Sequence, residues 1–368
     1  MRIASSVAII ALLAGAGQVA AQRDSTFSRD AARAILLDVR RITTPNGIER
    51  LEPVRIGDVR QWISVRGRDT ANPLLLFIHG GPGFSEMPAS WIYQAALEDH
   101  FTVVQWDQRG AGKSTFDENG QPLSRTVTFD RMIEDGVEMV AYLRRTYNHQ
   151  RIFVAGHSWG SIIGLELARA HPDWLHAYIG IGQVINSLAA ERVSYDWVLA
   201  EARKRGNREA VAQLEAIAGY PAPADKIKIQ DIIVERRWVN EFGGMSFGRT
   251  GLEYEFGARV LSPEWTSADL AADDNGEILV RLLPDLLRRD SSNLTTFECP
   301  IVIFAGRYDY AVPSQVVEQW FQNVRAPAKK FIWFENTAHM IQMERPGLFA
   351  SHLINDVRPL LGRRPDRD

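Results

Sequence analysis

The sequence predicts an α/β fold, in which helices cover both faces of a mostly parallel eight-stranded sheet. Two observations support this prediction. Short apolar runs rich in branched and aromatic residues alternate with longer segments of helical periodicity, as expected of strands joined by helical crossovers. Most of these runs are apolar at nearly every position, which indicates parallel strands buried on both faces.

The expected strands follow one another along the chain as roughly eight elements. Two form an opening hairpin around Gly57 and Asp58, since two short runs separated by such a dipeptide are typical of a hairpin. The hairpin strands are residues 51–56 and 61–65, followed by strands at 74–78, 101–106, 152–155, 177–181, 301–305 and 331–334. A helix over residues 161–170 follows the fifth strand and ends before Pro172.

The interval between the sixth and seventh strands breaks this alternation. Residues 186–292 carry helix-like charged patterns and many aromatic residues. We expect a mostly helical cap insertion over the carboxyl ends of the strands, where ligands bind in open α/β sheets. Residues 22–185 and 293–368 then form the two parts of one core, because no internal repeat or long polar linker separates them.

Residues 1–21 have the features of a secretory signal peptide. Arg2 precedes an apolar run over residues 7–16 that is too short to span a bilayer. Val19 and Ala21 suit the small positions before a cleavage site, so we expect cleavage after Ala21. A retained amphipathic anchor is the weaker interpretation, because the run has no polar face. The prediction is an exported protein, periplasmic or extracellular, without membrane attachment after cleavage.

Composition narrows the possible partners. A formal net charge of -3 over 368 residues gives no general attraction to nucleic acid. Cys299 is the single cysteine, and no two histidines have metal-ligand spacing. Gly112-Lys113-Ser114 ends like a phosphate-binding loop, but Asp107 stands where that loop needs glycine. We therefore expect no cofactor and no metal, and a small-molecule or short peptide substrate; the oligomeric state stays open.

The stretch Val-Ala-Gly-His-Ser-Trp-Gly-Ser, residues 154–161, places Ser158 between two glycines. A strand enters this stretch and a helix leaves it, so the serine occupies a sharp strand-turn-helix junction. The flanking glycines permit a strained turn and a close approach of strand and helix. The string alone also fits a plain glycine-rich turn, but in this context it predicts that Ser158 is a nucleophile.

A serine nucleophile needs a histidine base and a carboxylate that orients the histidine. Asp309 follows the seventh strand and His339 follows the eighth. Taken singly, Asp309 fits a turn-stabilising residue, and His339 fits an ordinary loop histidine. The order serine, aspartate, histidine, each just beyond a strand, predicts a triad. His352 is the weaker alternative, because its surroundings have a helical pattern.

Backbone amides should stabilise the oxyanion that develops during acyl transfer. One is expected from Trp159, directly after the nucleophile. The other is expected from His-Gly-Gly-Pro-Gly at residues 79–83, after the third strand. In this loop Gly81 is the preferred donor and Gly80 the second choice.

Four segments together resemble the proline iminopeptidase branch of the α/β-hydrolase fold. They are His-Gly-Gly-Pro-Gly at 79–83, Asp-Gln-Arg-Gly at 107–110 with Gly-Lys-Ser at 112–114, Gly-His-Ser-Trp-Gly-Ser at 156–161 and Gly-Arg-Tyr-Asp at 306–309. The resemblance implies a cap-covered serine peptidase that removes an amino-terminal residue, usually proline. By motif position, it gives the triad to Ser158, Asp309 and His339, and the oxyanion amides to Gly81 and Trp159.

The expected cap departs from this branch. Such aminopeptidases anchor the substrate ammonium with cap glutamates, one often in a Trp-x-x-Trp-Glu segment, whereas this chain has Trp238-Val-Asn-Glu241. The first substrate-binding candidates are therefore Glu241 and Trp238. Alternative anchors are Glu191, Glu235, Glu253 and Glu255, and alternative pocket aromatics are Phe242 and Phe247.

The sequence thus predicts a secreted serine hydrolase that acts through an acyl-enzyme, with proline iminopeptidase-like aminopeptidase activity as the first interpretation. A carboxylesterase or lactonase acting on a small ester is the alternative, because fold and triad do not fix the acyl group. A non-catalytic ligand-binding protein is the remote alternative. An epoxide hydrolase or dehalogenase is disfavoured, since those relatives carry aspartate in place of the serine.

Overall fold

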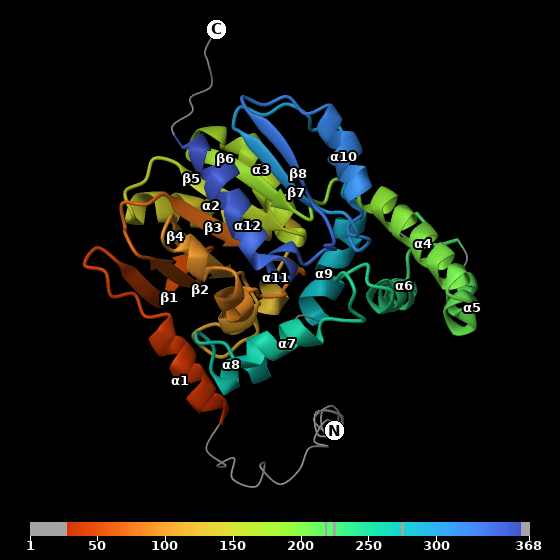
Figure 1. Ribbon diagram of the computed structural model, residues 1–368, viewed down its shortest axis with the longest axis horizontal. Coiled ribbons are helices and arrows are strands. Elements are labelled where there is room, and N and C mark those ends of the chain that lie inside the picture. The colour runs from red at the N-terminus through yellow and green to blue at the C-terminus, as the bar shows by residue number, and fades with distance from the viewer. Residues whose placement is uncertain (1–27, 218, 224–225, 274–275, 362–368) are drawn as a thin grey trace.

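One eight-stranded sheet forms the centre of the molecule in the computed structural model, which describes residues 28–217, 219–223, 226–273 and 276–361. The predicted signal peptide, residues 1–21, lies outside the described residues. The strand order is β1-β2-β4-β3-β5-β6-β7-β8, and helices lie on both sides of the sheet (Figure 1). No described helix combines the length and apolar character needed to cross a membrane.

The eight predicted strands are all present. Their bounds are β1 (Ile48–Ile56), β2 (Val59–Gly67), β3 (Leu74–Ile78), β4 (Thr102–Asp107), β5 (Ile152–His157), β6 (Leu175–Ile181), β7 (Ile301–Gly306) and β8 (Lys329–Phe334). The first two form the expected antiparallel hairpin, and β2 also pairs antiparallel with β4. The remaining neighbours pair in parallel, which confirms the mostly parallel α/β sheet.

Alternate residues of the central strands enter two separate hydrophobic cores. Leu76 of β3 packs in the core beneath α2 (Phe129–Thr146), α3 (Trp159–Ala170) and α10 (Ser314–Gln322). Its neighbour Phe77 enters the opposite core with Phe349, which belongs to α12 (Pro346–His352); α11 (Ile341–Glu344) lies on this same side. Because strand side chains alternate in direction, a strand buried on both faces must be apolar throughout.

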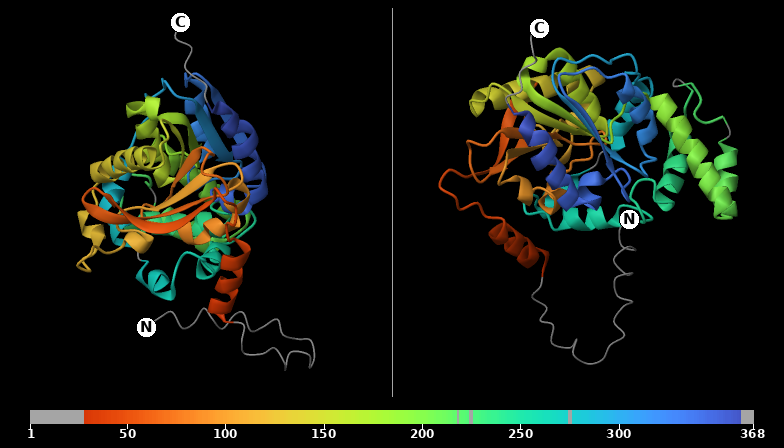
Figure 2. Two further views of the ribbon diagram at one scale, coloured as in Figure 1. Left: turned by 90° about the vertical axis from the view of Figure 1, so that its left-hand side faces the viewer. Right: turned by 45° about the horizontal axis from the view of Figure 1, so that its top comes forward.

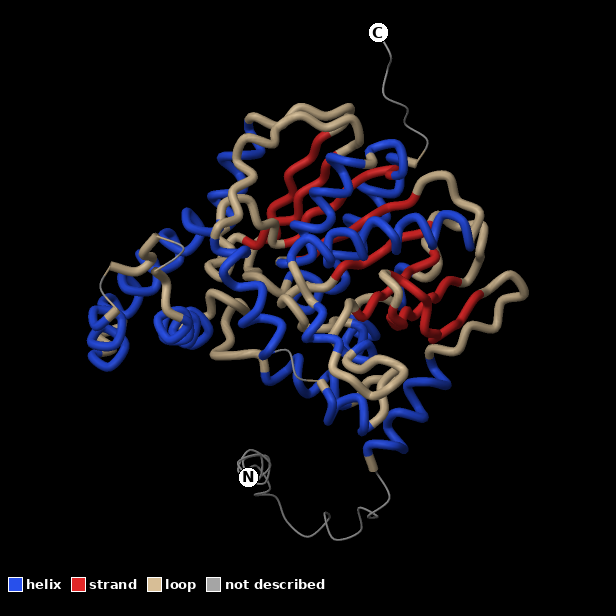
Figure 3. Tube along the Cα trace, turned by 180° about the vertical axis from the view of Figure 1, so that it is seen from behind, coloured by secondary structure: helices blue, strands red, loops and turns tan. Residues whose placement is uncertain are grey.

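Residues 186–292 contain six described α-helices. They are α4 (Ser187–Lys204), α5 (Arg208–Ala216), α6 (Ile229–Glu241), α7 (Glu253–Val260), α8 (Ser267–Ala272) and α9 (Gly276–Leu287). Figures 1 and 3 show α4, α5 and α6 projecting from one side of the sheet; in Figure 1, α7 and α8 lie below the sheet and α9 stands upright between α7 and α4. We call residues 186–292 the helical insertion.

The first described helix, α1 (Arg29–Val39), packs against the helical insertion (Figure 2). The Arg29 guanidinium donates to the carbonyl oxygen of Trp265 at 3.0 Å, and the Arg33 guanidinium donates to that of Pro263 at 2.9 Å. These contacts tie the segment that precedes β1 to the segment between β6 and β7.

Candidate active site

Ser158 occupies a strained turn between β5 and α3. Its φ of 51° and ψ of -120° lie in a region that non-glycine residues rarely adopt. A Cβ atom at Gly156 would stand 2.4 Å from the carbonyl oxygen of Gly160, and one at Gly160 would stand 2.1 Å from that of Ile78. Both glycines are therefore required for the close approach of strand and helix.

His339 and Asp309 lie in the loops after β8 and β7 and contact each other. His339 Nδ1 lies 2.7 Å from Asp309 Oδ2, and the other carboxylate oxygen accepts a hydrogen bond from the amide of Val312 at 2.8 Å. The Asp309 side chain is fully buried. This contact leaves Nε2 as the ring nitrogen free to act on Ser158, which lines the same cavity as His339.

Gly182, directly after β6, leaves room for the histidine ring. A Cβ atom on Gly182 would lie 2.8 Å from His339 Cε1, and its φ of 51° also favours glycine. The sequence offers no motif around this glycine, so its role emerges only from the proximity of the β6 and β8 loops.

The two expected oxyanion amides border the same space. Gly81 and Trp159 line one cavity with Ser158, and the Trp159 amide belongs to the first turn of α3, where amides have no partner within the helix. The Gly80 amide donates to Glu86 Oε1 at 3.2 Å, whereas the Gly81 amide makes no hydrogen bond to a described residue. This difference favours Gly81 over Gly80 as the donor.

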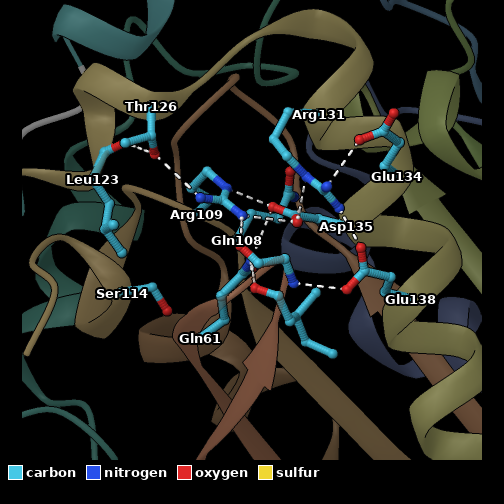
Figure 4. Close-up of polar contacts among 12 residues, drawn as sticks. Gln61, Gln108, Arg109, Ser114, Leu123, Thr126, Arg131, Glu134, Asp135 and Glu138 are labelled. Carbon is cyan, nitrogen blue, oxygen red and sulfur yellow. Dashed lines mark hydrogen bonds and ion pairs between the residues drawn. The ribbon is translucent and has the colours of Figure 1, made fainter.

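Gln108, after β4, links the segment 79–83 to the serine turn. Its side-chain amide donates to the carbonyl oxygen of His79 at 2.9 Å and accepts from the indole Nε1 of Trp159 at 3.0 Å. The next residue, Arg109, forms a buried two-point ion pair with Asp135 of α2 at 2.7 and 3.0 Å (Figure 4). The motif at residues 107–110 thus holds neighbouring segments in place.

Two cavities meet at Ser158. The larger, of about 300 Å³, is bounded by the turn of Ser158 and by α4, α6 and α9 of the helical insertion; the smaller, of about 210 Å³, is bounded by the segment 80–86 and by Leu252. Both include Gly81, Ser158, Met245, Leu279 and His339. The wall of the larger cavity is mostly aliphatic, with contributions from Val184, Ile232, Leu279, Leu283, Leu286, Leu287, Ala311 and Val312.

The two substrate-binding residues expected first, Glu241 and Trp238, do not line either cavity. Glu241 is exposed at the end of α6, and Trp238 is buried with its indole Nε1 donating to Gln213 of α5 at 3.1 Å. Ile232 and Arg236, one helical turn apart, form the face of α6 turned to the larger cavity. Glu241 lies two and a half turns after Ile232, which places it on the opposite face. Neither residue therefore contacts the space next to Ser158 in this structure, and their role in substrate binding stays a prediction.

The alternative candidates have different positions. Phe242 is buried in the packing of α6, while Glu253 and Phe247 are exposed. Glu255 is buried, and neither of its carboxylate oxygens has a hydrogen-bond partner among the described residues. Burial raises the pKa of Glu255 to about 7. Of these alternative candidates, only Glu191 lines either of the two cavities that meet at Ser158.

Glu191 belongs to a largely buried charge cluster beside the larger cavity. The guanidinium of Arg236, which also lines this cavity, donates to the carboxylates of Glu191 and Glu235. The hydroxyls of Tyr220 and Ser194 donate to Glu191 and Glu235, respectively. Burial raises the pKa of Glu235 to about 7. For Arg236, burial disfavours the charged form, but the neighbouring carboxylates of Glu191 and Glu235 raise the pKa of its guanidinium. Arg236 was not predicted, since an arginine within a helix usually faces solvent.

Known proteins resemble the chain over most of its length. A family model described as alpha/beta hydrolase fold matches residues 73–216. Probable aminopeptidase YbaC of Bacillus subtilis (strain 168) is 31% identical over 323 residues, which cover 86% of this chain and 99% of that protein. The proline iminopeptidase structure from Mycobacterium smegmatis has a TM-score of 0.61 at 21% identity, covering 84% of this chain and 98% of that one. Est816, described as an N-acyl homoserine lactone degrading enzyme, has a TM-score of 0.56 at 17% identity, covering 82% and 98% of the two chains.

Proposed function

Because the chain belongs to the α/β-hydrolase family and is a hydrolase of proline iminopeptidase-like type, we propose that it acts through a covalent acyl-enzyme at Ser158. The proposal rests on how three side chains are arranged in the structure. Ser158, in a strained turn at the start of α3, shares a cavity with His339, whose Nδ1 lies 2.7 Å from Asp309.

Acylation begins when Ser158 Oγ attacks the carbonyl carbon of the substrate and its proton passes to His339 Nε2. Asp309 accepts from Nδ1–H and thereby holds the ring in the tautomer that can take this proton. The amides of Gly81 and Trp159 donate to the new oxyanion, each contributing about 3 kcal/mol to transition-state stabilisation. The bond to the leaving group then breaks, and His339 delivers the proton to that group.

Deacylation repeats these steps with water as the nucleophile. His339 Nε2 removes a proton from the water, the resulting oxyanion forms at the same amides, and the acyl group leaves as Ser158 recovers its proton. The products are a carboxylic acid and the amine or alcohol released in the first step.

For the substrate, we propose a peptide with a free amino terminus. The cluster of Glu191, Glu235 and Arg236 contains two carboxylates and one guanidinium. Glu191 and Arg236 of this cluster line the larger cavity, whose wall is mostly aliphatic. With both carboxylates ionised, a substrate ammonium would balance the charge. Glu191 is the proposed anchor in place of Glu241, and the aliphatic wall suits a proline ring or another apolar side chain.

Three substrates test this proposal: proline p-nitroanilide, the same compound with its amine acetylated, and a short-chain p-nitrophenyl ester. We expect cleavage of the free-amine anilide, loss of cleavage on acetylation, and no turnover by Ser158→Ala. A fluorophosphonate probe should label Ser158 of the wild-type protein. Failure of the folded protein to react with this probe would contradict the serine mechanism itself.

A carboxylesterase or lactonase is the second candidate, and Arg236 favours it. The guanidinium already donates to both carboxylates of the cluster, which reduces their capacity to bind an ammonium. Neutral esters and lactones need no such anchor. Cleavage of the p-nitrophenyl ester alone, with full dependence on Ser158, would support this candidate and leave the mechanism unchanged.

We further propose that the protein is exported to the periplasm or the extracellular space. The support comes from the apolar run at residues 7–16 and the small residues before Gln22. Expression of the full chain in a bacterium should yield an exported protein that begins at Gln22. A cytosolic product that keeps Met1 would contradict export.

A further inference from the structure

Glu86, in the segment that follows Gly80 and Gly81, is buried and borders the smaller cavity together with Ser158 and His339. One carboxylate oxygen accepts from the amide of Gly80 at 3.2 Å and contacts His157 Nδ1 at 2.5 Å. The other accepts from the side-chain amide of Gln342 at 3.1 Å. A single carboxylate therefore joins the oxyanion segment, the residue before the nucleophile and the helix α11.

His157 extends this contact to the proposed general base. Its Nε2 lies 3.1 Å from the backbone oxygen of His339, and the centroids of the two imidazole rings are 4.8 Å apart. The His157 side chain is buried, yet it borders the smaller cavity together with Glu86. The path from Gly80 through Glu86 and His157 thus ends at the backbone of His339.

The partners of His157 define its charge. Its Nδ1 lies 2.5 Å from Glu86 and 3.3 Å from the side-chain amide nitrogen of Gln342, and its Nε2 lies 3.1 Å from the backbone oxygen of His339. The shorter contact at each nitrogen is to an acceptor, an arrangement that a ring with a proton on both nitrogens satisfies. Burial opposes this charge, but Glu86 raises the pKa of His157. Burial likewise opposes the charge of Glu86, but His157 lowers its pKa. The unpartnered carboxyl of Glu255 also favours protonated His157.

Stability alone is a weak reason for an ion pair at this place. Exchanging a buried ion pair for apolar side chains is often neutral or stabilising, because burial costs both ions their hydration. Here the pair contacts the backbone on both sides of Ser158, at Gly80 and at His339. A Cβ atom at Gly80 would lie 3.1 Å from Ser158 Cβ, so a shift of this segment would also move the surroundings of the nucleophile.

We propose that Glu86 and His157 form a positioning pair, which fixes the oxyanion segment and the loop of His339 relative to each other for the reaction at Ser158. The inference rests on the proposed serine mechanism but not on the identity of the substrate. Neither residue transfers a proton to the substrate. Glu86 holds the segment that supplies an oxyanion amide, and His157 holds the backbone of His339, the residue that transfers the proton.

The test compares Glu86→Gln with Glu98→Gln. Glu98 is a matched control, because it is also buried and accepts from the guanidinium groups of Arg40 and Arg66, before the amino end of β4. We expect Glu86→Gln to lower kcat and the rate of fluorophosphonate labelling about tenfold, because a small displacement of the oxyanion segment or of His339 misaligns the reacting groups. KM should change by less than about twofold, because the pair acts on the transition state and not on substrate binding. Glu98→Gln should keep wild-type kcat.

A double-variant cycle with His157→Gln separates positioning from general destabilisation. If the two residues act as one unit, Glu86→Gln/His157→Gln should lose no more kcat than the more severe single variant. The double variant removes both charges, so it also supplies the comparison with wild type if a single variant fails to fold. Additive losses, an equal loss of kcat in Glu98→Gln, or wild-type kcat in the double variant would overturn the pair. Unlabelled wild-type protein would instead refute the serine mechanism.

Discussion

Replacing Asp309 by asparagine should stop the reaction while leaving its geometry intact. Asp309 Oδ1 accepts from the amide of Val312 at 2.8 Å, and Oδ2 contacts His339 Nδ1 at 2.7 Å. In Asp309→Asn the carbonyl oxygen must keep facing the Val312 amide, because that group is a donor. The new NH2 group then faces Nδ1 and forces this nitrogen to accept. The proton of the neutral ring moves to Nε2, which can no longer take a proton from Ser158.

The size of the loss follows from this change of tautomer. A comparable aspartate-to-asparagine change in a serine protease lowers kcat about 10⁴-fold, which corresponds to about 5.4 kcal/mol of transition-state stabilisation. Steady-state rates with the best of the three substrates, together with the rate of fluorophosphonate labelling, measure it. Asp356→Asn is the matched control, because Asp356 contacts His352 Nδ1 at 2.6 Å in a pair that borders neither cavity. A loss of less than tenfold in Asp309→Asn, or an equal loss in Asp356→Asn, would refute the reasoning.

Three further changes test other parts of the site. Gly182→Ala should lower kcat about tenfold or more, because its Cβ would lie 2.8 Å from His339 Cε1; steady-state kinetics with unchanged circular dichroism checks this, and full activity would contradict the steric argument. Glu191→Gln should raise KM for proline p-nitroanilide about tenfold, without effect on the p-nitrophenyl ester, whereas Glu241→Gln should match wild type; equal KM values in both variants would remove Glu191 as the anchor. Glu255→Gln should raise Tm more at pH 8.5 than at pH 5.5. Burial raises the pKa of Glu255 from 4.5 to about 7, so any stability that its protonated form contributes is present below pH 4.5 and lost as the pH rises to 7; thermal unfolding at the two pH values measures this, and a pH-independent difference would contradict it.

The sequence predicted the core because its signals are local. Most central strands of the sheet are short apolar runs, and the run at 74–78 coincides with β3. The turn at Ser158 is marked by Gly156 and Gly160, whose missing side chains the structure requires. Asp309 and His339 were predicted as partners of Ser158 because each follows a strand in the chain order serine, aspartate, histidine. In the sheet, β5, β6, β7 and β8 are consecutive neighbours.

The helical insertion could not be predicted at the same level of detail. Its α6 is covered by α5 on one side and borders the larger cavity on another, so helical periodicity does not reveal which face meets substrate. Trp238 has the properties of a pocket residue, but they serve the packing against α5 equally well. The pairing of Glu86 with His157 was also missed, because 71 residues separate them and no sequence pattern links them.

The charge cluster offers a way to separate the two substrate classes by pH. Burial raises the pKa of Glu235 to about 7, so above this pH the cluster of Glu191, Glu235 and Arg236 has one negative charge in excess and attracts an ammonium. A peptide amine loses its own proton with a pKa of about 7.7 to 8.0. Recognition of a free amine should therefore be best between pH 7 and 8, where the ionised cluster and the charged ligand coexist.

KM for the free-amine anilide should show a minimum in this window, and Glu235→Gln should abolish its rise on the acid side. A neutral ester has no charge for the cluster to recognise, so its KM should not follow either ionisation. A flat KM profile for the anilide would mean that Arg236 has already neutralised the cluster, and the acyl group would then be selected by the aliphatic wall alone.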